Sequence, residues 1–249
     1  GSAIVTGNPN QAPAVVAVSN APICTGAGPL QFSETGGAQG VTWAWSGPGG
    51  YQSTAQNPVI ANPTPANSGH YTVVVMDANG CTNSAVVTVA IKPRPAAAIS
   101  GDDDVCQNEP LILTETGGEG VSWEWHSGTG WIASGQTLNY PNPTNAEFNG
   151  VAYVIVTGAN GCTSSALVDV IVYDAPSAVC PADVVICESE LPLNLAGLGA
   201  LPGGGTFSGP GVNGTSYSAA AGSTNTVTYT YTNENNCTDA CTFIVTVNA

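Results

Sequence analysis

The stretch S-E-T-G-G-A-Q-G-V-T-W-A-W at residues 33–45 decides the fold, because most of it returns as T-E-T-G-G-E-G-V-S-W-E-W at residues 114–125. Each copy places an alternating segment before a Gly-Gly turn and a second alternating segment, rich in tryptophan, after it. Alternation with a period of two residues is typical of a strand that buries one face. A duplicated strand–turn–strand unit therefore indicates an internal repeat built from strands.

Cysteines mark both ends of this repeat and reveal a third, more divergent copy. Each copy begins near one cysteine, termed the opening cysteine, and ends at an Asn-Gly-Cys or Asn-Asn-Cys turn that carries the turn cysteine. The opening cysteines are Cys24, Cys106 and Cys187, and the turn cysteines are Cys81, Cys162 and Cys237. Cysteine positions thus predict three repeats of similar length.

Proline-containing segments separate the repeats. K-P-R-P at 92–95 follows the first copy, and Y-D-A-P at 173–176 follows the second. Proline ends strands and stiffens linkers. We therefore predict repeats at residues 13–93, 94–174 and 175–249, joined by short linkers into an extended rod.

The last strand of each repeat shows the alternation most clearly. Its apolar positions share one face in all three copies: Ala85, Val87, Val89 and Ile91; Ala166, Val168, Val170 and Val172; Cys241, Phe243, Val245 and Val247. The sequence contains no comparable stretch with helical periodicity. Many short alternating segments between Gly, Pro and Asn turns predict an all-β chain of three tandem β-sandwiches.

The charge of the chain excludes several classes of partner. Only 8% of the 249 residues are charged, and seventeen acidic residues against two basic ones give a net charge of −15. Nucleic acid is excluded as a partner because phosphate binding needs clustered Lys and Arg. No apolar run reaches the roughly 20 residues that a membrane-spanning helix needs.

Eight cysteines, an even number, indicate disulfides and an oxidising compartment. Zinc is the competing interpretation, but the chain has no C-x-x-C and only two histidines, His70 and His126. Alignment of the repeats predicts pairing within each one, as Cys24–Cys81, Cys106–Cys162 and Cys187–Cys237. Cys180 and Cys241 replace inward-facing apolar residues of the other repeats, so we predict a fourth pair, Cys180–Cys241, within the third repeat.

Several motifs resemble a known group of surface modules. A-N-S-G-H-Y at 66–71 resembles the tyrosine-corner signature of immunoglobulin-like folds. M-D-A-N-G-C-T at 76–82 and G-A-N-G-C-T at 158–163 resemble the repeat ending of Ig-like and PKD-like cell-surface modules of Bacteroidota, and G-G-T-F-S-G-P-G-V at 204–212 is similar to a variant of that group. The resemblance implies three immunoglobulin-like sandwiches in an adhesin, a gliding adhesin or a cargo protein of type IX secretion.

Aromatic residues are the candidates for ligand contact. The pairs Trp43/Trp45 and Trp123/Trp125 are each two residues apart, so each pair shares one face, and we expect them in the core. Tyr51 and Trp131 follow the next turn at matching positions, and they are the candidates for an exposed contact with a surface glycan.

Acidic residues provide two further candidates. Asp102, Asp103 and Asp104 form a run before Cys106, which makes them candidates for calcium binding, although a solvated turn is the simpler interpretation. Glu34 and Glu115 recur before the Gly-Gly turn, where we expect them to accept hydrogen bonds from backbone N–H groups. Paired catalytic carboxylates are the alternative for these two residues.

Residues 1–12 do not fit the first repeat. They resemble the end of a last strand followed by a linker, so they are either the remnant of a preceding module or a donor strand that completes a neighbouring subunit. No G-x-S-x-G, H-E-x-x-H or P-loop pattern is present. We therefore expect no enzyme and no cofactor, calcium aside.

The sequence favours a secreted structural or adhesive protein of the cell surface, in which the sandwiches act as a rigid spacer and associate with similar modules. Two alternatives remain open at this point. One is a filament subunit assembled by strand donation from residues 1–12, and the other is a carbohydrate-binding accessory of a secreted enzyme.

Overall fold

The computed structural model describes residues 11–36, 40–148 and 150–249, and these form almost entirely strands. In these ranges the one α-helix is α1 (Asn145–Phe148), accompanied by four short 3-10 turns. Every sheet lies within one of three segments, 17–92, 99–173 or 184–248. The prediction of an all-β chain with immunoglobulin-like sandwiches is confirmed.

The first segment forms two main sheets. One has the order β1 (Ala17–Ser19), β3 (Leu30–Glu34) and β6 (Val59–Ile60); the other has the order β5 (Tyr51–Ser53), β4 (Gly40–Gly47), β7 (Gly69–Asp77) and β8 (Thr82–Val89). Alternate residues of β3 and β7 are buried, as the two-residue period requires. They pack with β4 in one core of Leu30, Phe32, Trp45, Tyr71, Val73 and Val75.

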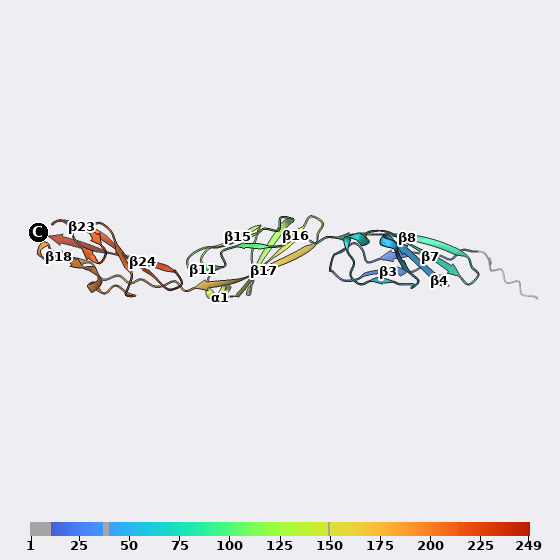
Figure 1. The fold of residues 1–249 in the computed structure, drawn as a ribbon, viewed down its shortest axis with the longest axis horizontal. Coiled ribbons are helices and arrows are strands. Elements are labelled where there is room, and N and C mark those ends of the chain that lie inside the picture. The colour runs from blue at the N-terminus through green and yellow to red at the C-terminus, as the bar shows by residue number, and fades with distance from the viewer. Residues whose placement is uncertain (1–10, 37–39, 149) are drawn as a thin grey trace, which may run out of the picture. The chain divides into compact units, whose positions relative to one another are not determined.

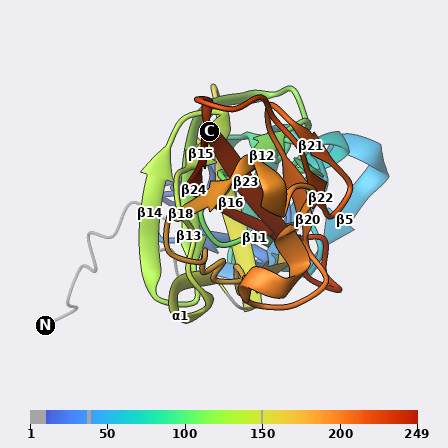
Figure 2. The same ribbon diagram turned by 90° about the vertical axis from the view of Figure 1, so that its left-hand side faces the viewer.

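The second segment repeats this plan (Figures 1 and 2). Its smaller sheet has the order β10 (Ile99–Gly101), β12 (Leu111–Glu115) and β15 (Thr137–Tyr140). Its larger sheet has the order β11 (Asp104–Cys106), β17 (Thr163–Tyr173), β16 (Gly150–Gly158), β13 (Gly120–Ser127) and β14 (Gly130–Ser134). The core again holds the second tryptophan of the pair, Trp125, which is fully buried.

The third segment is the most divergent. Its larger sheet has the order β18 (Val184–Cys187), β24 (Thr238–Asn248), β23 (Thr224–Thr232) and β20 (Thr206–Ser208), and its smaller sheet has the order β19 (Leu193–Asn194), β22 (Ser216–Tyr217) and β21 (Val212–Asn213). Tyr217, Val227 and Phe243 are among its buried core residues. Tyr229 is buried as well, and its hydroxyl donates a hydrogen bond to the carbonyl of Pro202.

Two features recur in all three segments and place the cysteines. The last strand pairs with the strand before it, as β8 with β7, β17 with β16 and β24 with β23. A short strand that ends on the opening cysteine runs parallel to the end of the last strand. In the first segment this strand is β2 (Ile23–Cys24), which pairs with β9 (Ile91–Lys92); β11 and β18 pair with β17 and β24 in the same way.

The chain divides into two compact units whose limits differ from the sheet segments. The first runs through Ala97 and includes Gly117–Ser122 and Ile155–Ser165. The second consists of Ala98–Thr116, Trp123–Val154 and Ala166–Ala249. The first unit thus contains the turn of the second repeat that carries Cys162.

The tyrosine corner implied by residues 66–71 is present in the first repeat. The Tyr71 hydroxyl donates a 2.9 Å hydrogen bond to the carbonyl oxygen of Asn67, and the ring is fully buried. Burial raises the pKa of this hydroxyl, and the nearby Tyr51 raises it further. The ring lies against Gly47, where an added Cβ would be 2.4 Å from two of its carbons.

This close approach predicts that Gly47→Ala destabilises the first repeat by about 1–3 kcal/mol, because the new methyl group overpacks the core beside Tyr71. The backbone of Gly47 is extended, so the effect comes from the side chain. Gly128→Ala is the control, since nothing lies within 4 Å of its Cβ position. Urea unfolding should show that the control changes the free energy of unfolding by no more than about 0.5 kcal/mol. Equal stability of the two variants would contradict the close packing of Gly47 against Tyr71.

Candidate functional site: disulfide joints between repeats

The first disulfide joins two different repeats. Cys24, the opening cysteine of the first repeat, is bonded to Cys162, the turn cysteine of the second, with their Cα atoms 5.8 Å apart. Both residues belong to the first compact unit. The bond therefore supplements the linker at 92–95 with a second covalent connection between consecutive repeats.

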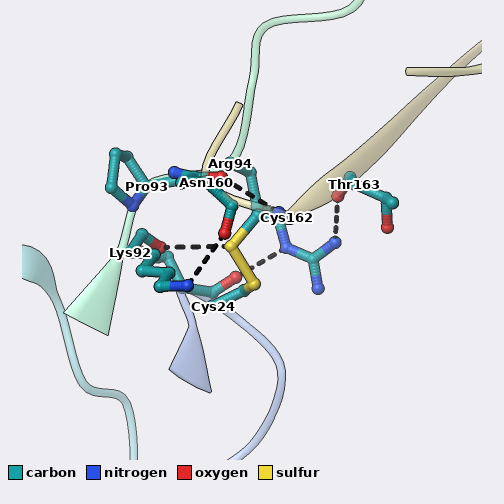
Figure 3. Close-up of a disulfide and its surroundings, with 8 residues drawn as sticks. Cys24, Lys92, Pro93, Arg94, Asn160, Cys162 and Thr163 are labelled. Carbon is teal, nitrogen blue, oxygen red and sulfur yellow. Dashed lines mark hydrogen bonds between the residues drawn. A yellow bond between two sulfur atoms is a disulfide. The ribbon is translucent and has the colours of Figure 1, made fainter. Parts of the chain in front are cut away.

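Both basic residues of the sequence surround this disulfide (Figure 3). The Lys92 ammonium donates a 2.9 Å hydrogen bond to the carbonyl oxygen of Asn160. The Arg94 guanidinium donates from Nε to the carbonyl oxygen of Thr25, at 2.6 Å, and from Nη1 to that of Thr163. Thr25 and Thr163 directly follow the two bonded cysteines, so Arg94 is hydrogen-bonded to the chain on both sides of the disulfide.

Main-chain and amide contacts complete the first joint. The backbone N–H of Thr25 donates to the Lys92 carbonyl at 2.9 Å, and the Asn160 side-chain amide donates to the Pro93 carbonyl at 2.8 Å. The linker is therefore bonded to the opening-cysteine segment on one side and to the Asn-Gly-Cys turn on the other. Cys162 itself is 1% exposed.

The second disulfide repeats the arrangement one repeat further on. Cys106, the opening cysteine of the second repeat, is bonded to Cys237, the turn cysteine of the third, with Cα atoms 5.5 Å apart. Asp174 of the linker accepts hydrogen bonds from Gln107 and Asn145 through its Oδ1, at 2.9 and 2.7 Å. Its carbonyl accepts a third, from the Asn233 side chain at 3.2 Å. This joint works through amides and a carboxylate, with neither Lys nor Arg in the bonding.

The predicted pairs Cys24–Cys81, Cys106–Cys162 and Cys187–Cys237 are therefore wrong, and strand length gives the physical reason. Each opening cysteine pairs in register with a residue at the end of the last strand: Cys24 with Lys92, Cys106 with Tyr173 and Cys187 with Asn248. Each turn cysteine stands eleven residues earlier, at the start of that strand. Eleven extended residues span about 35 Å, whereas bridged cysteines need Cα atoms within about 7 Å.

The fourth predicted pair, Cys180–Cys241, is confirmed, with Cα atoms 5.7 Å apart. It connects the beginning of the third repeat to β24. Cys81 and Cys187 are free in the chain. Cys81 is half-buried and Cys187 is exposed, whereas their counterparts in the two joints are better covered.

The two recurring glutamates are buried structural acceptors. Glu34 accepts from the backbone N–H of Gly36 at 2.6 Å and from the indole Nε1 of Trp43 at 3.4 Å. Glu115 accepts from the Trp123 indole at 2.9 Å and from the backbone N–H of Ala98 at 3.4 Å. The expected backbone hydrogen bonds are confirmed, and the tryptophan contacts were not anticipated. The first and second repeats therefore each hold one buried carboxylate of this kind.

The aromatic candidates separate into core and surface. Trp45 and Trp125 are buried in the cores, as expected. Trp43 and Trp123, which were also expected in the core, are half-buried and donate hydrogen bonds to the glutamates. Tyr51 packs beside Phe32 and Tyr71, with ring centroids 6.1 and 5.5 Å away, and burial raises its pKa. It belongs to the core of the first sandwich and offers little face to a ligand.

Trp131 differs, because 62% of its surface is exposed. It lies on β14, the edge strand of the five-stranded sheet, which is labelled in Figure 2. A glycan contact at Trp131 stays a prediction.

The acidic run Asp102–Asp104 is exposed. Asp104 lines a shallow hollow beside the second disulfide, together with Glu109 and Glu234. Within the described ranges, no three His, Cys, Asp or Glu residues gather closely enough to hold a metal ion. Calcium binding stays a prediction, and the donor-strand hypothesis for residues 1–12 falls mostly outside the described residues.

Comparisons with known proteins identify no family. No family model matches the chain, and no curated protein does. Similar solved structures include murine CEACAM1b (10% identity, TM-score 0.37, covering 64% of this chain and 99% of that one). The three N-terminal domains of the Hoc outer capsid protein of bacteriophage RB49 are similar at 15% identity and TM-score 0.36, covering 95% and 98%.

A calcium-stabilised adhesin with which an Antarctic bacterium binds ice is similar at 16% identity and TM-score 0.39, covering 96% of this chain and 75% of that one. Likeness at this level extends to no ligand, partner or activity. Among the described residues, none of the helices has the length and hydropathy to cross a bilayer.

The first joint predicts a selective effect of Arg94→Ala. Loss of the hydrogen bonds to Thr25 and Thr163 removes about 1 kcal/mol of net stabilisation around the bond, so dithiothreitol should reduce Cys24–Cys162 about fivefold faster. Cys106–Cys237 in the same molecule is the internal control, because Arg94 does not contact it. Timed alkylation and peptide mapping give both rates; an equal acceleration of the two bonds would contradict the assigned role of Arg94.

Proposed function

We propose that the chain is a non-enzymatic structural or adhesive protein of the extracellular surface, in which disulfides between consecutive repeats preserve spacing under tension. The observation that carries this proposal is the pairing of the first two opening cysteines with the turn cysteine of the following repeat, at Cys24–Cys162 and Cys106–Cys237. Stable disulfides of this kind belong to oxidising compartments.

A second covalent connection changes what a linker can do. A single chain segment lets neighbouring domains swivel, which is the default for small interfaces. Here the linker residue Lys92 is hydrogen-bonded to Thr25 and to Asn160, on either side of the disulfide. Two attachments on each joint restrict rotation about the linker, which suits a spacer and serves no catalytic purpose.

The disulfides also shorten the covalent path that carries tension between the two ends. From the N-terminus the path runs to Cys24, crosses to Cys162, continues to Cys180, crosses to Cys241 and reaches the C-terminus. Residues 25–161 and 181–240 lie outside this path. Pulling on the ends therefore cannot extend residues 25–161 or 181–240 while the bonds are intact.

Resistance to proteolysis supports an exposed location. Lys92 and Arg94 are each followed by proline, and both take part in the first joint. Trypsin-like proteases, which cut after Lys or Arg, therefore meet no accessible site in the sequence. This property favours long-lived display at a surface.

Single-molecule pulling tests the proposal. In the oxidised chain the covalent path holds about 50 residues, so its fully stretched length should be about 180 Å at about 3.5 Å per residue. After reduction all 249 residues extend, to about 870 Å. Cys81→Ser/Cys187→Ser is the form to use, because it keeps the three internal disulfides and cannot cross-link.

The oxidised length also distinguishes the two pairing schemes. In this form, pairing within repeats could form only Cys106–Cys162 and Cys180–Cys241. Residues 1–106, 162–180 and 241–249 would then lie in the path, which gives about 470 Å. A measured length near that value, or near the reduced length, would contradict the proposed resistance to extension.

The exposed Trp131 supports a second role, contact with a surface glycan, because stacking on a sugar needs an accessible ring. Trp131→Ala should then abolish binding on a glycan array. Leu167→Ala, which removes another exposed apolar side chain of the same repeat, should leave binding unchanged. Equal loss in both variants, or binding by neither the native chain nor the variants, would contradict this role.

A further inference from the structure

The joints follow one rule, and the rule leaves two cysteines over. The opening cysteine of one repeat bonds the turn cysteine of the next, which uses Cys24 with Cys162 and Cys106 with Cys237. The opening cysteine of the third repeat, Cys187, and the turn cysteine of the first, Cys81, remain free. We propose that Cys187 of one copy of this chain bonds Cys81 of a second copy, which links the copies head to tail.

Cys187 lies in the position that forms the joint in the other two repeats. It ends β18, which runs parallel to the end of β24 and pairs Cys187 with Asn248. The equivalent pairs, Cys24 with Lys92 and Cys106 with Tyr173, occupy the same register beside a formed disulfide. The local conformation is fixed, because the backbone N–H of Cys187 donates a 2.7 Å hydrogen bond to Glu190.

The turn that carries Cys81 has the same backbone hydrogen bonds as the two turns that are already bonded. The N–H of Asp77 donates to the Cys81 carbonyl at 3.0 Å, as Gly158 does to Cys162 at 2.9 Å and Asn233 to Cys237 at 3.0 Å. The residue before each cysteine has a positive φ: +79° at Gly80, +82° at Gly161 and +63° at Asn236. Cys81 is therefore held in the conformation that its counterparts adopt when bonded.

The side chains around Cys81 repeat the third-repeat turn in particular. Asp77 accepts from the backbone N–H groups of Asn79 and Cys81, at 2.9 and 2.8 Å. Asn233 accepts in the same way from Asn235 and Cys237, both at 3.0 Å. That turn bonds Cys106 with neither lysine nor arginine contributing, so the absence of a basic residue near Cys187 is no obstacle.

The exposure of Cys81 and Cys187 supports a second copy of this chain as their bonding partner. Cys162 and Cys237, which are bonded, are each 1% exposed. Cys81, on the same turn, is only half-buried, and Cys187 is exposed. One chain thus carries both uncovered halves of a joint that it has already formed twice internally, which makes another copy of the chain chemically complementary to it.

The bond forms by two thiol–disulfide exchanges with a small-molecule disulfide such as oxidised glutathione. The Cys81 thiolate attacks the glutathione disulfide, forms a mixed disulfide and releases one glutathione thiolate. The Cys187 thiolate of the second copy then attacks the Cys81 sulfur and releases the second glutathione. Two cysteine thiols are oxidised, one glutathione disulfide is reduced to two thiols, and the thiol protons pass to solvent or to the released thiolates.

The inference rests on the proposed function only for where the bond forms in nature, which is the extracellular surface. The reaction itself can be tested with purified protein. Cys81→Ser keeps only Cys187 free, and Cys187→Ser keeps only Cys81 free. Each variant should stay monomeric on a non-reducing gel in a glutathione redox buffer. An equimolar mixture should give a dimer and no longer species, whereas the native chain should give a ladder of multiples.

Peptide mapping completes the test. The mixed dimer should contain a Cys81–Cys187 peptide, and Cys24–Cys162, Cys106–Cys237 and Cys180–Cys241 should persist in both chains as the control for folding. A Cys187–Cys187 dimer of Cys81→Ser alone, a Cys81–Cys187 bond within one native monomer, or failure of the mixture to dimerise would each overturn the inference. None of these outcomes affects the pulling experiment, which uses the doubly substituted chain.

Discussion

The register of a short parallel strand against the end of the last strand is the constraint on which the molecule depends. It places each opening cysteine at the end of the repeat that leads into the linker. The turn cysteine stands eleven residues earlier, about 35 Å away along an extended strand. The opening and turn cysteines of one repeat are therefore kept apart, and Cys24 and Cys106 bond the turn cysteine of the following repeat instead. Cys24–Cys162 and Cys106–Cys237 connect the sandwiches because the last strand is too long for an opening cysteine to reach the turn cysteine of its own repeat.

The sandwiches and the joints are stabilised by different interactions. Each sandwich is stabilised by alternating apolar faces, by buried tryptophan and, in the first two repeats, by a buried glutamate that bonds an indole. The joints are held by covalent bonds and by hydrogen bonds to main-chain carbonyls. Lys92 and Arg94, the whole basic content of the chain, serve the first joint. Asp174 and nearby amides do the same work at the second.

Much of the fold could be predicted from the sequence. The two-residue period identifies the strands, and the repeat alignment identifies Cys180–Cys241, because both cysteines replace apolar residues that face inward. The three other pairs could not be obtained from alignment alone. Pairing within a repeat and pairing with the next repeat use equivalent positions, so the alignment fits both. The signal that distinguishes them is the length of strand between Cys81 and Lys92, considered together with the parallel pairing of Cys24 beside Lys92. That pairing depends on tertiary structure, as does the burial that assigns Tyr51 to the core and leaves Trp131 outside.

Cutting the first linker tests the central claim most directly. A specific protease site inserted beside Pro95 allows the chain to be cleaved between the first and second repeats without reductant. With Cys24 bonded to Cys162, the two fragments should remain one species on a non-reducing gel and separate only after reduction. Separation of the fragments without reductant would show that the cysteines pair within repeats and would contradict the account.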